Sequence, residues 1–247
     1  MDSIGEYVFR VRSYECDKDG LATLPTICNY LQESASMHAE TLGFSKSDFA
    51  AVGDEITWVL TRMRVRMDRY PKWDETVKVS TFPRGGRRIV AWRDFTLTDG
   101  DGLLLGVATT EWMVIDMATR KIVAVPQKVF DAANTVLTPV LGGDPFTKFR
   151  CPEESEGAEV FEFVAQNSHI DVNGHVNNVH YVEWMLEPCP DARPSEMEVV
   201  FRSETFAREK VLVSVSGGPD GACYHRVYAA DGRDHVVAVT RNARERG

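Results

Sequence analysis

The sequence predicts an α+β protein that contains two copies of one structural unit. A helix-like stretch that begins near Leu24 is followed by a cluster of segments with strand periodicity, and the same order of elements recurs in the second half. A helix followed by clustered strands indicates an antiparallel sheet that covers the helix on one side, rather than alternating β-α-β units.

The helix of the first half has the clearest pattern. Its apolar residues fall on one face at helical spacing, Thr23 is a suitable cap, Pro25 lies in the first turn and Gly43 ends the pattern. A shorter helix is expected from about residue 177 to 187, where Pro188 stops it.

Strand periodicity is clearest at residues 62–67, where apolar and basic side chains alternate. Similar runs occur in both halves of the chain. Further strands are expected at residues 76–82, 90–98, 104–115, 198–206, 211–216, 224–229 and 236–240.

A weak internal repeat relates the two halves. The alignment matches residues 17–20 with 171–174, residues 74–79 with 208–213, and the hairpin turn Asp99-Gly100 with Asp231-Gly232. Each half therefore has the order turn, helix, antiparallel strands.

Residues 134–157 break both periodicities, because they are rich in Pro and Gly and include an acidic run. We expect a linker there. The predicted domains are residues 1–133 and residues 158–247.

Composition excludes several classes of protein. The chain has 247 residues, of which 43% are hydrophobic and 26% charged, as in an ordinary globular protein. A net charge of −9 argues against a general nucleic-acid or anionic-membrane binder. We expect no membrane insertion, since no long apolar run is present. Five cysteines without a CxxC pair indicate free thiols, so we expect a cytoplasmic location.

The segment Asp171-Val172-Asn173-Gly174-His175 is a candidate for chemistry. Taken alone, it is an ordinary turn before a helix cap, and a structural role is the simpler interpretation. The repeat favours a functional role. The first half retains the turn but has Leu21 opposite His175 and Tyr70 opposite Glu204. We therefore expect the first half to keep the architecture and the second half to carry the chemistry.

Three groups of residues occur in a characteristic order: residues 13–15 with 31–33, residues 58–73 and residues 171–178. With these motifs the chain resembles the acyl-acyl carrier protein thioesterases of plants and bacteria. The resemblance covers about residues 9–239 and implies a tandem (double) hotdog fold, in which each half is a long helix wrapped by an antiparallel sheet. It also implies a thioester hydrolase that releases free fatty acid from fatty acyl-acyl carrier protein in fatty acid biosynthesis.

The resemblance implies four catalytic residues: Asp171, Asn173, His175 and Glu204. Plant members usually have a Cys directly after this Glu, whereas this chain has Thr205, so a Cys nucleophile at that position is excluded. No cofactor is implied. No metal is expected either, because the histidines lack zinc-ligand spacing with an acidic partner.

Thioester hydrolysis needs an activated water and a stabilised carbonyl oxygen. Glu204, expected on a strand, is the preferred base, either alone or with Asp171. His175 is expected to donate to the carbonyl oxygen or to orient the water, and Asn173 to hold either group with its amide.

The first half is expected to form the acyl pocket, with Trp58, Leu60, Met63 and Trp92 among the lining residues, although an ordinary core role is the favoured interpretation for any one of them. Basic residues are concentrated at positions 62–88, and we expect them to attract the acidic carrier protein. A monomer and a homodimer are both compatible with the sequence.

Two alternatives stay open. The first is an acyl-coenzyme A thioesterase of the same fold, in which the basic residues would contact the nucleotide phosphates. The second is a non-catalytic acyl or carrier-protein binding module, in which the segment before the second helix is only a turn and cap. The presence of His175 and Glu204 in a single copy speaks against the second alternative.

Overall fold

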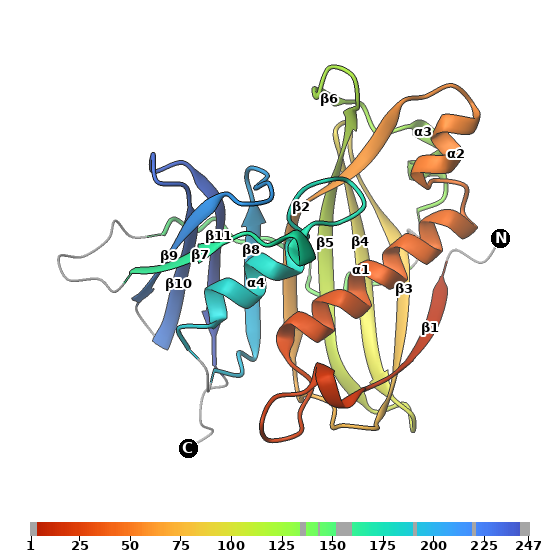
Figure 1. Ribbon diagram of the computed structural model, residues 1–247. Helices are drawn as coiled ribbons and strands as arrows, with labels where there is room; N and C mark the ends of the chain where they lie inside the picture. The colour runs from red at the N-terminus through yellow and green to blue at the C-terminus, as the bar shows by residue number, and fades with distance from the viewer. Residues whose placement is uncertain are drawn as a thin grey trace. The chain divides into compact units, whose positions relative to one another are not determined.

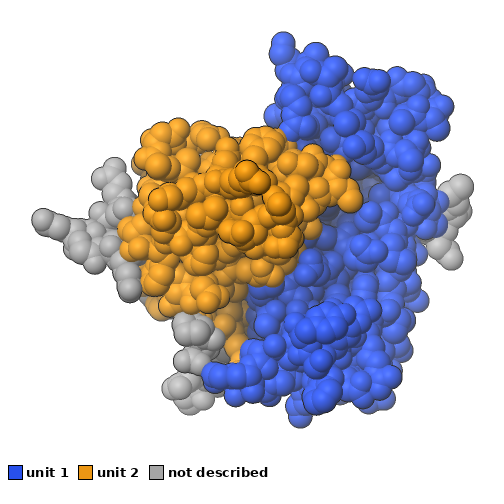
Figure 2. All heavy atoms as spheres, in the orientation of Figure 1, with its two compact units in different colours: residues 1–145 blue, residues 146–247 orange. Residues whose placement is uncertain are grey.

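The computed structural model describes residues 4–133, 137–142, 144–151, 160–189, 192–218 and 221–242. The chain divides into two compact units, unit 1 with residues 1–145 and unit 2 with residues 146–247, which Figure 2 shows in two colours. Each unit contains a helix and an antiparallel sheet, so the α+β prediction is confirmed. Among the described residues, no helix is long and apolar enough to cross a membrane.

Unit 1 is built on the long helix α1 (Leu24–Thr41), which lies along an antiparallel sheet with the strand order β1-β3-β4-β5-β2 (Figure 1). β6 pairs with β5 beside this order. The sheet and the shorter helices comprise β1 (Gly5–Arg10), a 3-10 turn η1 (Ser13–Glu15), α2 (Lys46–Ala51), β2 (Ile56–Met67), β3 (Thr76–Arg87), β4 (Val90–Asp99), β5 (Leu104–Asp116), β6 (Ile122–Val123) and α3 (Gln127–Asp131).

The ends of α1 follow the sequence signals. The Thr23 hydroxyl accepts a hydrogen bond from Thr26 N at 3.3 Å, and Gly43 follows the helix with a φ of 72°, in the left-handed region. The inward face places Ile27 and Leu31 in the core with no exposed surface. Complete burial of such side chains stabilises a fold by roughly 1.5–3 kcal/mol each.

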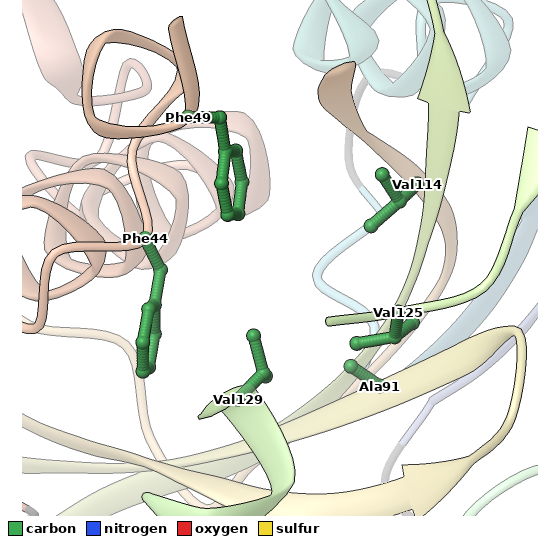
Figure 3. Packing of buried hydrophobic residues seen from close by; sticks show 6 residues of the cluster. All are labelled: Phe44, Phe49, Ala91, Val114, Val125 and Val129. Carbon is green, nitrogen blue, oxygen red and sulfur yellow. The ribbon is translucent and has the colours of Figure 1, made fainter. Parts of the chain in front are cut away.

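An apolar cluster fills one end of unit 1, where α2 and α3 cover the sheet. In Figure 3 two phenylalanines from the α2 region face valines and an alanine from the sheet side and from α3. The six buried members are Phe44, Phe49, Ala91, Val114, Val125 and Val129. The two short helices were not predicted from the sequence, since their apolar runs are too brief to show helical periodicity.

Unit 2 repeats the same plan with shorter elements. α4 (Asn178–Leu186) begins after Asn177, whose side chain accepts a hydrogen bond from Val179 N at 3.0 Å. The strand order is β8-β11-β10-β9-β7. The strands and the 3-10 turn are β7 (Val160–Val164), η2 (Asn167–His169), β8 (Glu196–Phe201), β9 (Lys210–Gly217), β10 (Ala222–Tyr228) and β11 (Asp234–Arg241).

The internal repeat is visible in the backbone. The aligned residues Asp74 and Arg208 both take the left-handed conformation, with φ values of 69° and 70°. Equivalent hydrogen bonds occur at nearly equal lengths: Asp17 N to Leu21 O (2.8 Å) with Asp171 N to His175 O (2.9 Å), and Ala22 N to Pro71 O (2.9 Å) with Val176 N to Thr205 O (2.8 Å). The two units therefore share a backbone framework around positions whose side chains differ.

The predicted match between the hairpin turns Asp99-Gly100 and Asp231-Gly232 is wrong by two positions. Gly102 and Gly232 are the equivalent residues, with φ values of 87° and 85°, and they close their turns onto the carbonyls of Asp99 and Ala229. Unit 1 contains two successive Asp-Gly pairs, and only the second glycine takes the conformation that closes the turn.

The predicted linker is only partly described, because residues 134–136, 143 and 152–157 lie outside the described residues. The described part is bonded to strand side chains of its own unit. In unit 1, Val140 N donates to Asp94 (3.2 Å), Arg84 to Gly142 O (3.1 Å) and Arg64 to Pro145 O (2.8 Å). In unit 2, Thr147 N and its hydroxyl donate to Glu198 (3.0 and 2.7 Å). The boundaries at residues 133 and 158 stay a prediction.

His225 ties α4 to the sheet of unit 2. Its Nδ1 lies 2.9 Å from Met185 O and its Nε2 2.8 Å from the Thr240 hydroxyl, and burial lowers the pKa of His225 from 6.5 to about 4. In the unfolded chain, His225 therefore binds a proton as the pH falls below about 6.5. In the folded chain, it binds one only below about pH 4. The stabilising contribution of neutral His225 is complete above pH 6.5 and is lost as the pH falls from 6.5 to 4.

We therefore expect the free energy of unfolding to fall by roughly 3 kcal/mol across this pH window through His225 alone. Urea denaturation of the native chain and of His225→Gln at several pH values measures the contribution. The variant should be less stable at pH 7.5 and should show a flatter pH dependence. Parallel curves for the two proteins would contradict the assignment.

Candidate active site

The segment 171–175 forms a tight turn between η2 and α4 (Figure 1). Asp171 Oδ1 accepts a hydrogen bond from Asn173 N at 2.8 Å, and Gly174 N donates to Asp171 O at 3.0 Å. Gly174 has a φ of 86°, a conformation that glycine adopts without strain. The turn places His175 directly before the helix.

His175 lies between two carboxylates. Its Nε2 is 3.4 Å from Glu204 Oε1, and its Nδ1 is 3.9 Å from Asp171 Oδ1. The side chains of His175 and Glu204 are 23% and 30% exposed, so a substrate and water can reach both. Asn173 is exposed and bonds to Asp171 through its main-chain N–H and, at 3.4 Å, through its side-chain amide. The structure thus brings His175, Glu204 and Asp171 together, and Asn173 joins them through Asp171.

Glu204 lies in a loop after β8, so its predicted position on a strand is wrong. β8 ends at Phe201 because Arg202 N and Ser203 N both turn to His235 O, at 2.8 and 3.3 Å. The predicted strand extends to Phe206, although residues 202–205 are polar. The strand ends five residues earlier because two main-chain N–H groups turn to His235 O, a contact that the sequence pattern does not reveal.

The loop is held at its other end by the turn that carries His175. Thr205 O accepts a hydrogen bond from Val176 N at 2.8 Å. Thr205 is fully buried, so its hydroxyl is closed to a substrate.

Burial raises the pKa of the Cys28 thiol to about 12 and that of the Cys151 thiol to about 11, which disfavours their reactive thiolate forms.

Two side chains that were not predicted as site residues border Glu204. Tyr181 from α4 is 2% exposed and His235 from β11 is 1% exposed, and their rings are stacked with centroids 6.5 Å apart.

Among the described residues, no group of three or more His, Cys, Asp and Glu side chains is arranged to hold a metal ion.

Of the expected acyl-pocket residues, Trp92 lies on the face of the sheet opposite the core. Trp58, Leu60 and Met63 belong to the core face of β2, and Trp58 packs against the apolar cluster of Figure 3. Trp92 follows Ala91 of that cluster, so alternation along β4 directs it to the opposite face. There its Nε1 donates to Glu111 Oε2 at 3.0 Å.

The basic residues at positions 62–88 do not form one free surface. Arg69 pairs with Glu75 and Asp99 at 2.6 and 2.7 Å, while Arg64 and Arg84 bond to backbone carbonyls of the segment after residue 136. The expectation that the whole concentration attracts a carrier protein is therefore too broad. Several of these arginines serve the fold.

Two family models match the chain: the acyl-ACP thioesterase N-terminal domain over residues 6–133 and the acyl-ACP thioesterase C-terminal domain over residues 153–240. The chain is 30% identical to a palmitoyl-acyl carrier protein thioesterase of Gossypium hirsutum, over 94% of the chain and 62% of that protein. It is 34% identical to an oleoyl-acyl carrier protein thioesterase of Arabidopsis thaliana, over 81% of the chain and 59% of that protein. The chain thus spans about three fifths of these relatives.

The fold is similar to that of a solved structure, an acyl-ACP thioesterase from Bacteroides thetaiotaomicron. The TM-score is 0.85 at 24% identity, over 97% of this chain and 98% of that one. This likeness supports the predicted tandem hotdog fold, in which α1 and α4 are the helices wrapped by the two sheets. The matched models together cover most of both units, and the chain belongs to the acyl-ACP thioesterase family.

Proposed function

We propose that this protein hydrolyses the thioester of fatty acyl-acyl carrier protein and releases free fatty acid. Membership of the family and the names of the palmitoyl and oleoyl relatives support the substrate class. The observation that carries the chemistry is the contact of His175 Nε2 with Glu204 Oε1 at 3.4 Å, at the start of α4. A cytoplasmic location and the oligomeric state remain predictions.

Glu204 is the proposed general base. Its carboxylate is partly exposed and lies 3.4 Å from the imidazole of His175, so a water that approaches from solvent can contact the carboxylate beside the histidine. The water oxygen attacks the thioester carbon while its proton passes to Glu204. The C–S bond then breaks, the proton moves to the departing thiolate sulfur, and the products are the free fatty acid and the carrier thiol.

His175 is the proposed donor to the carbonyl oxygen, where negative charge develops during the attack. Several main-chain N–H groups at the start of α4 are already bonded and are not free to donate to the carbonyl oxygen. The N–H groups of Asn177, Val179 and His180 already bond to His169 O, to the Asn177 side chain and to Asn177 O. The imidazole therefore carries more of the oxyanion stabilisation than the helix terminus.

Asp171 is better suited to orient His175 than to act as the base. Its Oδ1 already accepts the main-chain N–H of Asn173, and the equivalent Asp17 of unit 1 accepts the N–H of Asp19 at 2.9 Å in a turn that has no histidine. The shared bond indicates that this aspartate first of all builds the turn. In unit 2 its carboxylate also lies 3.9 Å from His175 Nδ1, close enough to favour one orientation of the ring.

The activity is tested by thiol release from palmitoyl- and oleoyl-acyl carrier protein and from the same acyl groups on coenzyme A. We expect higher kcat/KM values on the carrier-protein esters. Faster turnover of the coenzyme A esters would favour the acyl-coenzyme A alternative, and no release from any ester would favour the non-catalytic binding module.

Substitution of His175 or Glu204 should lower kcat strongly. We expect His175→Ala and Glu204→Gln each to reduce kcat by about 10²- to 10⁴-fold, the usual effect of losing a positioned proton donor or acceptor. The matched control is His180→Ala, which removes a nearby partly exposed histidine whose Nδ1 lies 2.6 Å from Glu183. Native kcat in both site variants, or an equal loss in the control, would contradict the assigned roles.

Thiol-blocking reagents should leave the activity largely intact, because Thr205 occupies the position after Glu204 and is buried. The native chain is treated with iodoacetamide, freed of the reagent and assayed on acyl-carrier protein. Mass spectrometry counts the alkylated cysteines, and we expect kcat to change less than about twofold. A loss of kcat that parallels alkylation would show that a cysteine takes part in the reaction.

A further inference from the structure

We propose that Tyr181 and His235 are positioning residues for Glu204, and that together they form a buried polar floor beneath its loop. Only the kinetic test of this inference rests on the proposed function. The geometry concerns unit 2 alone, since α4, β11 and the loop 202–205 all belong to that unit.

His235 holds the loop by its backbone and by its side chain. Its carbonyl accepts the N–H groups of Arg202 and Ser203, at 2.8 and 3.3 Å. Its Nδ1 lies 3.0 Å from the Ser203 hydroxyl, which also donates to Asp234 O at 3.0 Å. His235 therefore fixes Ser203, the residue directly before Glu204, both through its carbonyl and through its buried ring.

Tyr181 closes the same loop from the helix side. Its ring stacks on His235 and lies 6.3 Å from the ring of Phe201, the last residue of β8. Its hydroxyl is buried close to Thr205, but neither hydroxyl has a hydrogen-bond partner among the described residues, so Tyr181 contacts the loop through the packing of its ring. Thr205 is anchored in turn to Val176, the neighbour of His175. Tyr181 thus lies where the loop of Glu204 and the turn of His175 are joined.

Both groups remain uncharged near neutral pH. Burial lowers the pKa of His235 and raises the pKa of Tyr181 to about 12. A neutral polar floor can hold the backbone beside a carboxylate without forming an ion pair that would weaken Glu204 as a base.

A comparison with the equivalent positions of unit 1 distinguishes a positioning role of Tyr181 and His235 from ordinary core packing. In unit 1, Asp68 N and Arg69 N donate to Leu105 O at 2.8 and 3.3 Å, the same two bonds at the same lengths as those to His235 O. Leu105 is therefore the equivalent of His235, and the ungapped alignment of the turns makes Ile27 the equivalent of Tyr181.

Both equivalents are fully buried and apolar. The fold is thus satisfied by Ile and Leu at these two positions. The polar pair occurs in the unit that has His175 and Glu204, whereas the apolar pair occurs in the unit that has Leu21 and Tyr70.

The test uses Tyr181→Ile and His235→Leu, and the unit 1 equivalents Ile27 and Leu105 show that both replacements fit the framework. We expect each variant to lower kcat on palmitoyl-acyl carrier protein by roughly ten- to a hundredfold, with KM within about twofold of the native value, because a displaced base weakens chemistry rather than binding. His235→Asn should recover part of kcat, since its amide nitrogen can replace Nδ1 towards Ser203.

Two matched controls remove buried groups of the same kinds. Tyr30→Phe deletes a buried hydroxyl that donates to Glu15 at 2.8 Å, and His225→Gln replaces a buried histidine that bonds to Met185 and Thr240. The controls should lose thermal stability without a loss of kcat. An equal fall of kcat in the controls, or native kcat in both Tyr181→Ile and His235→Leu, would overturn the proposal.

Crystal structures of the native chain and of His235→Leu provide a second measurement that is independent of any activity. We expect the distance from His175 Nε2 to Glu204 Oε1, 3.4 Å in the native chain, to increase by 1 Å or more in the variant. An unchanged distance would overturn the positioning role even if kcat fell. A native chain without thioesterase activity, but with the expected displacement in the variant, would overturn the proposed function alone.

Discussion

The hydrogen bond from Val176 N to Thr205 O, 2.8 Å long, is the contact on which the candidate site depends. It joins two loops that are distant in sequence: the turn that ends in His175 and the loop that carries Glu204. A main-chain bond of this kind is independent of side-chain identity, and its equivalent in unit 1, from Ala22 N to Pro71 O, has almost the same length. The fold therefore brings these two loops together in both units. Whether the junction can do chemistry depends on the side chains that the framework carries there.

Unit 1 shows what the framework needs and unit 2 what the chemistry adds. The turn retains its aspartate and its left-handed glycine in both units, because Asp17 and Asp171 accept the same main-chain N–H and Gly20 and Gly174 have φ values of 73° and 86°. These residues are structural before they are functional. His175 and Glu204 have no such architectural duty, since Leu21 and Tyr70 occupy the same backbone positions.

Much of the fold could be predicted from the sequence, and the failures have specific physical causes. The predictions for α1, α4 and most strands were confirmed because their apolar periodicity and caps are local signals. The loop position of Glu204 was missed, because β8 ends where two amides turn to His235, a residue more than thirty positions away. The bonds of Val140, Gly142, Pro145 and Thr147 were missed for the same reason, whereas the short helices α2 and α3 were missed because their apolar runs are too brief to show helical periodicity. His175 and Glu204 could be singled out only because the repeat and the family resemblance supplied a comparison.

Three carboxylates with different surroundings show why Glu204 is suited to the role of base. Asp94 and Glu198 are fully buried, and each receives hydrogen bonds from a threonine hydroxyl and from a main-chain N–H, so their oxygens are committed to holding neighbouring segments. Glu204 differs because its loop is fixed through the backbone while its side chain stays partly exposed beside His175. A general base must be both rigidly placed and reachable by water. Anchoring the main chain on either side of Glu204, and leaving its carboxylate open, meets both requirements at once.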